Sequence, residues 1–244
     1  MTVLRALTPR TRQRHAHHTR PPVLVQLDDV TLRDPAGRPL VQNLSWCIRA
    51  GQRWALFCDD RPAATALLRC IAGLQQPQQG QVEIKGHVSW PLGQVSGLSP
   101  KLSALENSVV LAGIYGDGGQ NAQVLEEIRK LGGLDVAQWK KPIKQLPALT
   151  KTKLHLALSL AFDFDLYVID PAVIRPLVRA SEWNEIWQRR LENRCRRRAL
   201  VTLSVAPLQL DATCRRALVL KQGRVVTRGS LSMCREAAQQ RASA

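Results

Sequence analysis

Hydrophobic positions follow two kinds of pattern along the chain. Short uninterrupted apolar runs bounded by turn-forming residues predict buried strands at Trp54–Phe57, Leu166–Ile169 and Ala199–Leu203. Apolar residues recur at helical spacing over Asn121–Leu131, and again over the helix-length segment Lys151–Phe162. Buried strands that alternate with helices are typical of an α/β fold.

A second group of segments alternates between apolar and polar residues. Val23–Leu27 followed by Val30–Leu32 predicts the first strand of a β-subdomain, and Leu40–Ile48 and Gly80–Val88 predict further strands. Arg216–Val226 predicts a hairpin with Gly223 in its turn.

Composition adds one unusual feature, a formal net charge of +16 from 35 Lys+Arg against 19 Asp+Glu. Three partners would suit this excess: nucleic acid, an anionic membrane face or an acidic polymer. An arginine-rich protein with solvated surfaces would show the same excess. The six cysteines are scattered without a CxxC pair, so we expect reduced thiols and no metal site. No stretch approaches ~20 uninterrupted apolar residues, so we expect no membrane span.

The organisation expected along the chain has three parts. Residues 1–22 are rich in Arg and His and carry no acid, which predicts a disordered basic arm. Residues 23–230 are expected to form a single domain, and residues 231–244 a polar tail that is helical at most in part. The arm has no apolar core of the kind that a secretory signal needs.

One carboxylate stands out, because Asp170 directly follows the buried run Leu166–Ile169. Phosphate-binding α/β domains place a metal-side acid in this way, at the carboxyl end of a strand. The run Ala161–Asp165 precedes the same strand, and the segments Ser89–Gly93 and Leu102–Asn107 lie earlier in the chain.

In these segments the chain resembles the ATP-binding subunits of ABC transporters, in the branch that exports capsular and related polysaccharides. The resemblance covers roughly Val23 to Gly229. It implies an ABC-type nucleotide-binding domain, with a P-loop-like α/β core, a small antiparallel β-subdomain and a helical subdomain at about residues 94–160.

The phosphate loop departs from the family pattern. A working loop needs glycines whose backbone N–H groups approach the phosphates, a lysine for the β- and γ-phosphates and a hydroxyl for Mg²⁺. The corresponding segment is Cys58–Thr65, in which Ala64 stands in the lysine position and only Thr65 keeps the expected chemistry. Asp59 and Asp60 add negative charge where a triphosphate would lie, and Cys58, Arg61 and Ala63 replace the glycines.

Other family positions are also changed. The catalytic glutamate position is Pro171, the aspartate that contacts the opposite cassette is Leu177, and the switch histidine is Val205. The adenine-stacking aromatic is replaced by Asp34, and the glycine-bearing signature by residues 148–150. Removing lysine, base and sensor together leaves too little to stabilise a phosphoryl-transfer transition state, so we expect no catalytic residue.

Three residues keep the expected type and position: Thr65, Gln94 and Asp170. They are the residual nucleotide-binding candidates that the resemblance implies. In that family the region of Gln94 also receives the coupling helix of the membrane subunit, so Gln94, Leu98 and Leu102 are the expected permease-docking residues. A surface glutamine without such a role is the plainer interpretation of Gln94.

The resulting hypothesis is a catalytically degenerate cassette subunit of a polysaccharide-export ABC transporter. Its expected partners are a membrane permease and a second ATP-binding cassette, in a homo- or heterodimer, with an anionic lipid surface near its arginines. It would lie peripherally on the cytoplasmic face of a bacterial inner membrane, without a cofactor. One alternative is an active ATP-hydrolysing subunit with unusual motifs, and only this alternative would require ATP and Mg²⁺ as cofactors. A cassette fold that binds nucleic acid or an anionic polymer is another alternative, although nucleic acid is not expected because stacking aromatics are missing.

Overall fold

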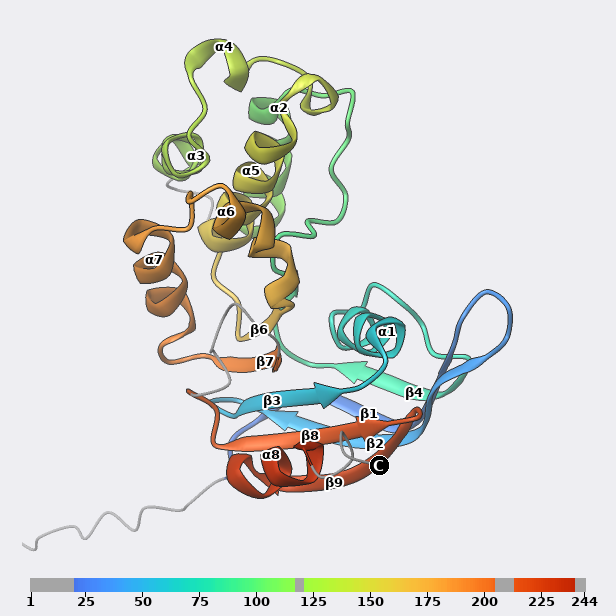
Figure 1. Ribbon diagram of the computed structural model, residues 1–244. Coiled ribbons are helices and arrows are strands. Elements are labelled where there is room, and N and C mark those ends of the chain that lie inside the picture. The colour runs from blue at the N-terminus through green and yellow to red at the C-terminus, as the bar shows by residue number, and fades with distance from the viewer. Residues whose placement is uncertain (1–19, 117–120, 205–212, 240–244) are drawn as a thin grey trace, which may run out of the picture.

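A computed structural model describes residues 20–116, 121–204 and 213–239. Two sheets and the helix between them form one lobe, and most of the helices form a second lobe above it (Figure 1). The predicted basic arm therefore lies almost wholly outside the described residues, as do the end of the predicted polar tail and Val205. None of the helices in the described ranges is long and apolar enough to cross a membrane.

The smaller sheet is antiparallel, with strand order β2-β1-β4. β1 contains an irregularity at Asp29, which has a positive φ of 48°, so that the two apolar segments Val23–Leu27 and Val30–Leu32 both remain in one strand. Its strands are β1 (Val23–Arg33), β2 (Pro39–Arg49) and β4 (Gln79–Ile84).

The larger sheet has strand order β5-β6-β7-β3-β8-β9, and every pairing is parallel except that of β8 with β9. The predicted buried runs β3, β6 and β7 lie next to one another in its centre. Its strands are β3 (Arg53–Cys58), β5 (Val88–Pro91), β6 (Leu166–Ile169), β7 (Ala199–Leu203), β8 (Arg216–Lys221) and β9 (Arg224–Ser230). The turn between β8 and β9 has positive φ at Gln222 and Gly223, as the predicted hairpin requires.

The prediction of a single strand over Gly80–Val88 is wrong, because the chain changes sheets within it. β4 ends at Ile84 in the small sheet and β5 begins at Val88 in the large one. The connection is held by the backbone N–H of His87, which donates to Asp165 Oδ2 at 3.0 Å. Asp165 lies 78 residues away in sequence, so apolar periodicity gives no sign of this anchor.

Helix α1 (Arg61–Ile71) lies between the two sheets (Figure 1). Its buried residues form one hydrophobic cluster with side chains of both sheets, including Leu27, Trp46 and Leu56. The small sheet, α1 and the large sheet are therefore joined by one core, which explains why the amino-terminal strands and the buried parallel strands pack as a unit.

The helices of the second lobe share a cluster with the large sheet. This cluster of the second lobe contains Phe162 and Phe164 together with Trp90 of β5 and Tyr167 of β6. The helices of this lobe include α3, whose predicted bounds are confirmed, and α5, which begins three residues before the predicted segment. Asn184 caps α7. The remaining elements are α2 (Ala104–Tyr115), α3 (Asn121–Leu131), α4 (Val136–Trp139), η1 (Ile143–Gln145), α5 (Ala148–Ala161), η2 (Pro171–Ile174), α6 (Arg175–Arg179), α7 (Glu185–Cys195) and α8 (Leu231–Gln239).

Candidate nucleotide site and docking surface

The connection from β3 to α1 is shorter than the predicted phosphate loop. β3 ends at Cys58 and α1 begins at Arg61, so only Asp59 and Asp60 lie between them. The expectation that Cys58–Thr65 forms a loop is therefore wrong, because its second half is helical. Pro62 occupies one of the first two helical positions, where its fixed φ favours helix initiation and its missing N–H costs nothing.

The two alanines at the start of α1 are packed in the core. Ala63 has an exposed fraction of 0% and Ala64 of 1%. Ala64 is the residue in the expected lysine position, and it lies in the same cluster as Leu67 and Leu68. At this position the helix supplies apolar packing where a phosphate loop supplies a cation.

The metal-side acid that the sequence predicts is already paired. Asp170 follows β6 and is almost fully buried, and its Oδ2 accepts a hydrogen bond from Arg61 Nη2 in an ion pair. Its Oδ1 accepts the backbone N–H of Ala172 at 3.0 Å, which caps the turn η2. A guanidinium from the first turn of α1 thus neutralises the carboxylate on which a metal ion would depend.

The other two candidates lie at the same edge of the large sheet. Thr65 is half-buried and follows Arg61 by four residues in α1, so both lie on one side of that helix. Gln94 follows β5 as Asp170 follows β6, and these strands are parallel neighbours. The backbone turn at Gln94 is anchored by Ser159 Oγ, which accepts Gly93 N at 3.0 Å and Trp90 Nε1 at 2.7 Å.

The residues present do not fit a Mg²⁺–nucleotide complex. The cation of Arg61 lies on the metal-side carboxylate, the connection is too short to surround phosphates, and Asp59 is exposed beside it. Within the described residues there is no group of three or more His, Cys, Asp or Glu side chains that could hold a metal ion.

Two of the other changed positions, Leu177 and Asp34, have structural roles in this fold. Leu177 is fully buried in the cluster of the second lobe, so it presents nothing to an opposite cassette. Asp34 holds a turn, since its Oδ1 accepts backbone N–H groups of Ala36 and Arg38 at 3.0 and 2.9 Å. The hydrogen bond from the Arg38 backbone, first among several, lowers the pKa of the Asp34 carboxyl.

The predicted docking residues differ in exposure. Leu98 is partly buried and packs against the cluster of the second lobe, whereas Leu102 is 37% exposed. Helix α2 exposes further apolar side chains that were not predicted, namely Val109, Val110 and Ile114. The sequence of α2 could have predicted this exposure, because its apolar residues lie on nearly every side of the helix instead of along one stripe.

Asn107 fixes the segment that carries Leu102. Its side-chain oxygen accepts Ser99 N at 2.8 Å, and its Nδ2 lies within hydrogen-bond distance of the carbonyl oxygens of Ser99, Leu102 and Ser103. Asn107 is itself only 3% exposed. A buried amide that is satisfied in this way holds the loop before α2 in one conformation.

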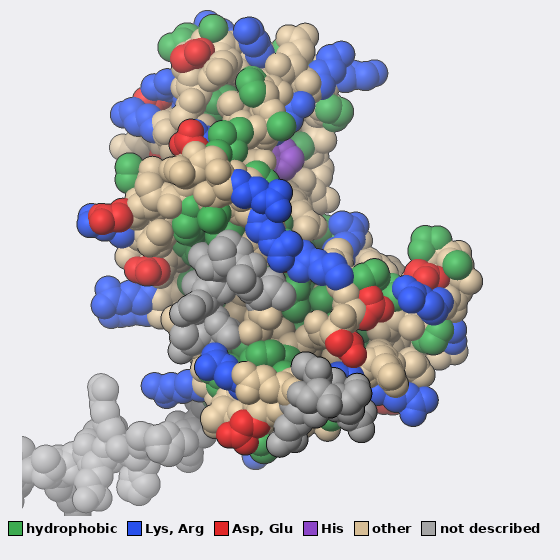
Figure 2. Space-filling view, in the orientation of Figure 1, with side chains coloured by type: hydrophobic (Ala, Val, Ile, Leu, Met, Phe, Trp, Pro, Cys, Tyr) green, Lys and Arg blue, Asp and Glu red, His purple; other side chains and the backbone are tan. Residues whose placement is uncertain are grey.

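Most arginines between Arg189 and Arg198 form ion pairs with carboxylates of the same chain. Arg189, Arg190, Arg194 and Arg198 pair with carboxylates in the described part of the chain. Figure 2 shows Lys and Arg side chains in a diagonal band over the region of α6 and on toward α1, and Arg175 and Arg179 of α6 are exposed. The free positive charge on this face thus lies beside the candidate site.

Comparisons with known proteins agree with this fold. No protein-family model matches the chain. It is 29% identical over 153 residues to the polysialic acid transport ATP-binding protein KpsT of Escherichia coli. The aligned region covers 60% of this chain and 68% of that protein. It is 25% identical over 187 residues to the capsule polysaccharide export ATP-binding protein CtrD of Neisseria meningitidis, covering 76% and 83%.

Among solved structures, the ATP-binding cassette MJ0796 in a dimeric post-hydrolysis state superposes with a TM-score of 0.63 at 18% identity, covering 85% of this chain and 99% of that one. This confirms the predicted fold class, with its small antiparallel sheet beside an α/β core. The chain has the fold of an ATP-binding cassette, and its sequence is related to those of the ATP-binding proteins of capsule polysaccharide export.

Proposed function

We propose that this chain is a cassette subunit of a polysaccharide-export ABC transporter that neither binds nor hydrolyses ATP at the family site. The observation that carries the proposal is the ion pair between Arg61 and Asp170. Phosphoryl transfer is catalysed by positioned cations around the phosphates, and here a cation of the chain itself holds the carboxylate that would position the metal.

The surroundings of the ion pair support the same proposal. A nucleotide would have to displace Arg61 from Asp170, leaving a carboxylate that is only 1% exposed without its partner. It would also need backbone donors that a two-residue connection with Asp59 and Asp60 does not offer. Both costs oppose binding before any chemistry begins.

What the subunit supplies, in this proposal, is contact with a membrane permease. The docking surface comprises Gln94, Leu98 and Leu102 together with the exposed face of α2, and Asn107 holds its loop in place. Apolar side chains that are grouped on one exposed surface are typical of interaction sites. The subunit would pair with a second cassette and lie at the cytoplasmic face of the inner membrane, with its free cations near anionic headgroups.

Isothermal titration calorimetry with Mg-ATP tests the proposal directly. We expect no saturable Mg²⁺-dependent binding at millimolar nucleotide, while KpsT of Escherichia coli serves as the positive control in the same buffer. A micromolar dissociation constant for this chain, lost in Asp170→Asn and in Thr65→Ala, would contradict the proposal, because those side chains belong to the family site.

A further inference from the structure

A large cavity lies at the edge of the parallel sheet opposite the candidate nucleotide site. Its volume is about 1340 Å³. It is lined by Arg53 and Arg216, which begin β3 and β8, and by Arg196 just before β7. These are the amino-terminal ends of the strands, whereas Asp170 follows the carboxyl end of β6. The cavity is therefore a separate place in the fold.

The lining of the cavity carries excess positive charge. Four arginines line it, and Glu192 is the one carboxylate among the lining residues. In the residues that the structure describes, no ion pair joins Arg196, Arg215 or Arg216 to a carboxylate, and all three are exposed. Because all three side chains are exposed and line the cavity, their guanidinium groups face the solvent there.

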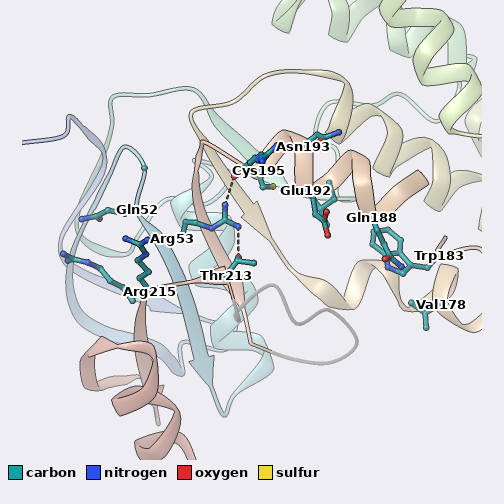
Figure 3. A pocket seen from close by; sticks show the side chains of 14 residues that line it. Gln52, Arg53, Val178, Trp183, Gln188, Glu192, Asn193, Cys195, Thr213 and Arg215 are labelled. Atoms are coloured by element: carbon teal, nitrogen blue, oxygen red, sulfur yellow. Dashed lines mark hydrogen bonds between the residues drawn. The ribbon is translucent and has the colours of Figure 1, made fainter. Parts of the chain in front are cut away.

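One of these arginines is held in a fixed orientation. Arg53 Nη1 donates to the carbonyl oxygen of Cys195 at 2.6 Å, and its Nη2 donates to Thr213 Oγ1 at 2.7 Å (Figure 3). Its Nε is enclosed and has no hydrogen-bond partner. Arg216 is also placed by a neighbour, with its guanidinium 5.6 Å from the ring centroid of Trp54. Preorganised guanidinium groups lose little entropy when they bind an anion.

The opposite end of the cavity has a different character. Figure 3 shows Trp183, Val178 and Gln188 together, across the cavity from Arg53 and Arg215. Trp183 is half-buried and offers an aromatic surface, with Gln188 as a polar neighbour. A ligand that contacts both ends needs an anionic part and an organic part that can pack against a ring.

We propose that this cavity binds a phosphate ester that carries at least two negative charges and whose organic part extends toward Trp183. Guanidinium groups match phosphate geometry with paired hydrogen bonds, and several unpaired arginines suit more than one negative charge. The same chemistry occurs in soluble nucleoside diphosphates and in lipid phosphomonoesters. This site is independent of the family nucleotide site, because none of its lining residues belongs to that site.

The test is calorimetry of the full chain with uridine diphosphate in the presence of EDTA, which removes the metal that the family site needs. We expect saturable binding, weakened at least about tenfold in the double variant Arg196→Gln/Arg215→Gln because two charge-assisted contacts are lost. Arg197→Gln is the control, since it removes one positive charge from an exposed neighbour outside the cavity. It should change affinity by less than about twofold.

Two further probes separate the parts and the sources of the ligand. Trp183→Ala should weaken uridine diphosphate binding but leave the binding of inorganic pyrophosphate unchanged. Vesicles that contain phosphatidic acid, in phosphatidylcholine, distinguish a lipid source, since only a lipid ligand would make sedimentation with vesicles depend on Arg196 and Arg215. The proposal is overturned if the wild-type chain binds neither uridine diphosphate nor vesicles that contain phosphatidic acid. It is also overturned if uridine binds as well as uridine diphosphate, or if Arg197→Gln weakens binding as much as the double variant.

Discussion

Arg61 and Asp170 lie 109 residues apart in sequence and form an ion pair that joins the start of α1 to the end of β6. The Asp170 side chain is 2% exposed and the Arg61 side chain is 44% exposed. Water can therefore solvate the guanidinium group without the pair, whereas the buried carboxylate has little access to water. The pair therefore links these two elements through groups of the chain itself.

Replacing Arg61 by Ala should therefore destabilise the fold. The buried carboxylate would lose its cation, and partial exposure of Arg61 reduces the cost to about 1–3 kcal/mol in free energy of unfolding. Urea denaturation measures the change. Arg38→Ala is the control, because it breaks an exposed ion pair with Asp34 and should destabilise the fold clearly less than Arg61→Ala. Equal losses in the two variants would contradict the structural importance of the Arg61 pair.

The thermal midpoint should not respond to Mg-ATP. A ligand that binds only the native state raises the midpoint, and in the proposed function the family site does not bind the nucleotide. Differential scanning calorimetry with and without millimolar Mg-ATP measures this. Two further scans separate any contribution of the arginine-lined cavity: one of the wild type with ATP in EDTA, and one of the Arg196→Gln/Arg215→Gln variant with Mg-ATP. A Mg²⁺-dependent rise that survives this double variant would count against loss of the family site.

Asn107→Ala should loosen the docking segment without unfolding the protein. The substitution removes the acceptor for Ser99 N and the donor to three carbonyl groups, at a cost of about 1–3 kcal/mol. Hydrogen exchange should speed up at Ser99 first. Val109→Ala changes an exposed position of the same helix and should leave that exchange unchanged. Unaltered protection in Asn107→Ala would show that the loop is held by other contacts.

Permease docking can be tested by co-expression with the neighbouring permease and recovery of the complex from membranes. Leu102→Asp and Ile114→Asp place a charge on the exposed apolar surface and should abolish specific co-purification. Ile186→Asp, on α7, makes the same change at a 66% exposed position outside that surface and should have no effect.

Leu98→Asp is a poorer probe, because Leu98 packs against the core and its loss would also destabilise the fold. A deletion of residues 1–22 should weaken only the salt-sensitive part of membrane binding. Normal co-purification of Leu102→Asp, together with complete release of the deletion variant, would favour simple electrostatic tethering.

Cys195 should make the protein less stable at high pH. Burial raises the pKa of its thiol from 9.0 to about 12, so the unfolded chain releases this proton at lower pH than the folded one. The stability is therefore fully present below pH 9.0 and is lost as the pH rises toward about 12. Denaturation between pH 8 and pH 11 should show a shallower decline in Cys195→Ala than in the wild type. Parallel declines would contradict the assignment to this thiol.

The class of fold and most of its elements follow from the pattern of apolar and polar residues. Runs such as Leu166–Ile169 are strands because uninterrupted apolar residues can be buried on both faces, and α3 begins and ends where its polar and glycine residues predict. The loss of glycines and of the lysine around Ala64 was equally visible, because these are properties of single positions in a known register.

Tertiary structure decided which charged groups meet. Local pattern does not reveal that Arg61 reaches Asp170, that Arg53 is held by the Cys195 carbonyl group, or that Asp165 redirects the chain at His87. Each of these contacts joins residues that are more than 70 positions apart. The physical reason is that apolar burial depends on local periodicity, whereas the energy of a charge depends on its distance from other charges once the chain has folded.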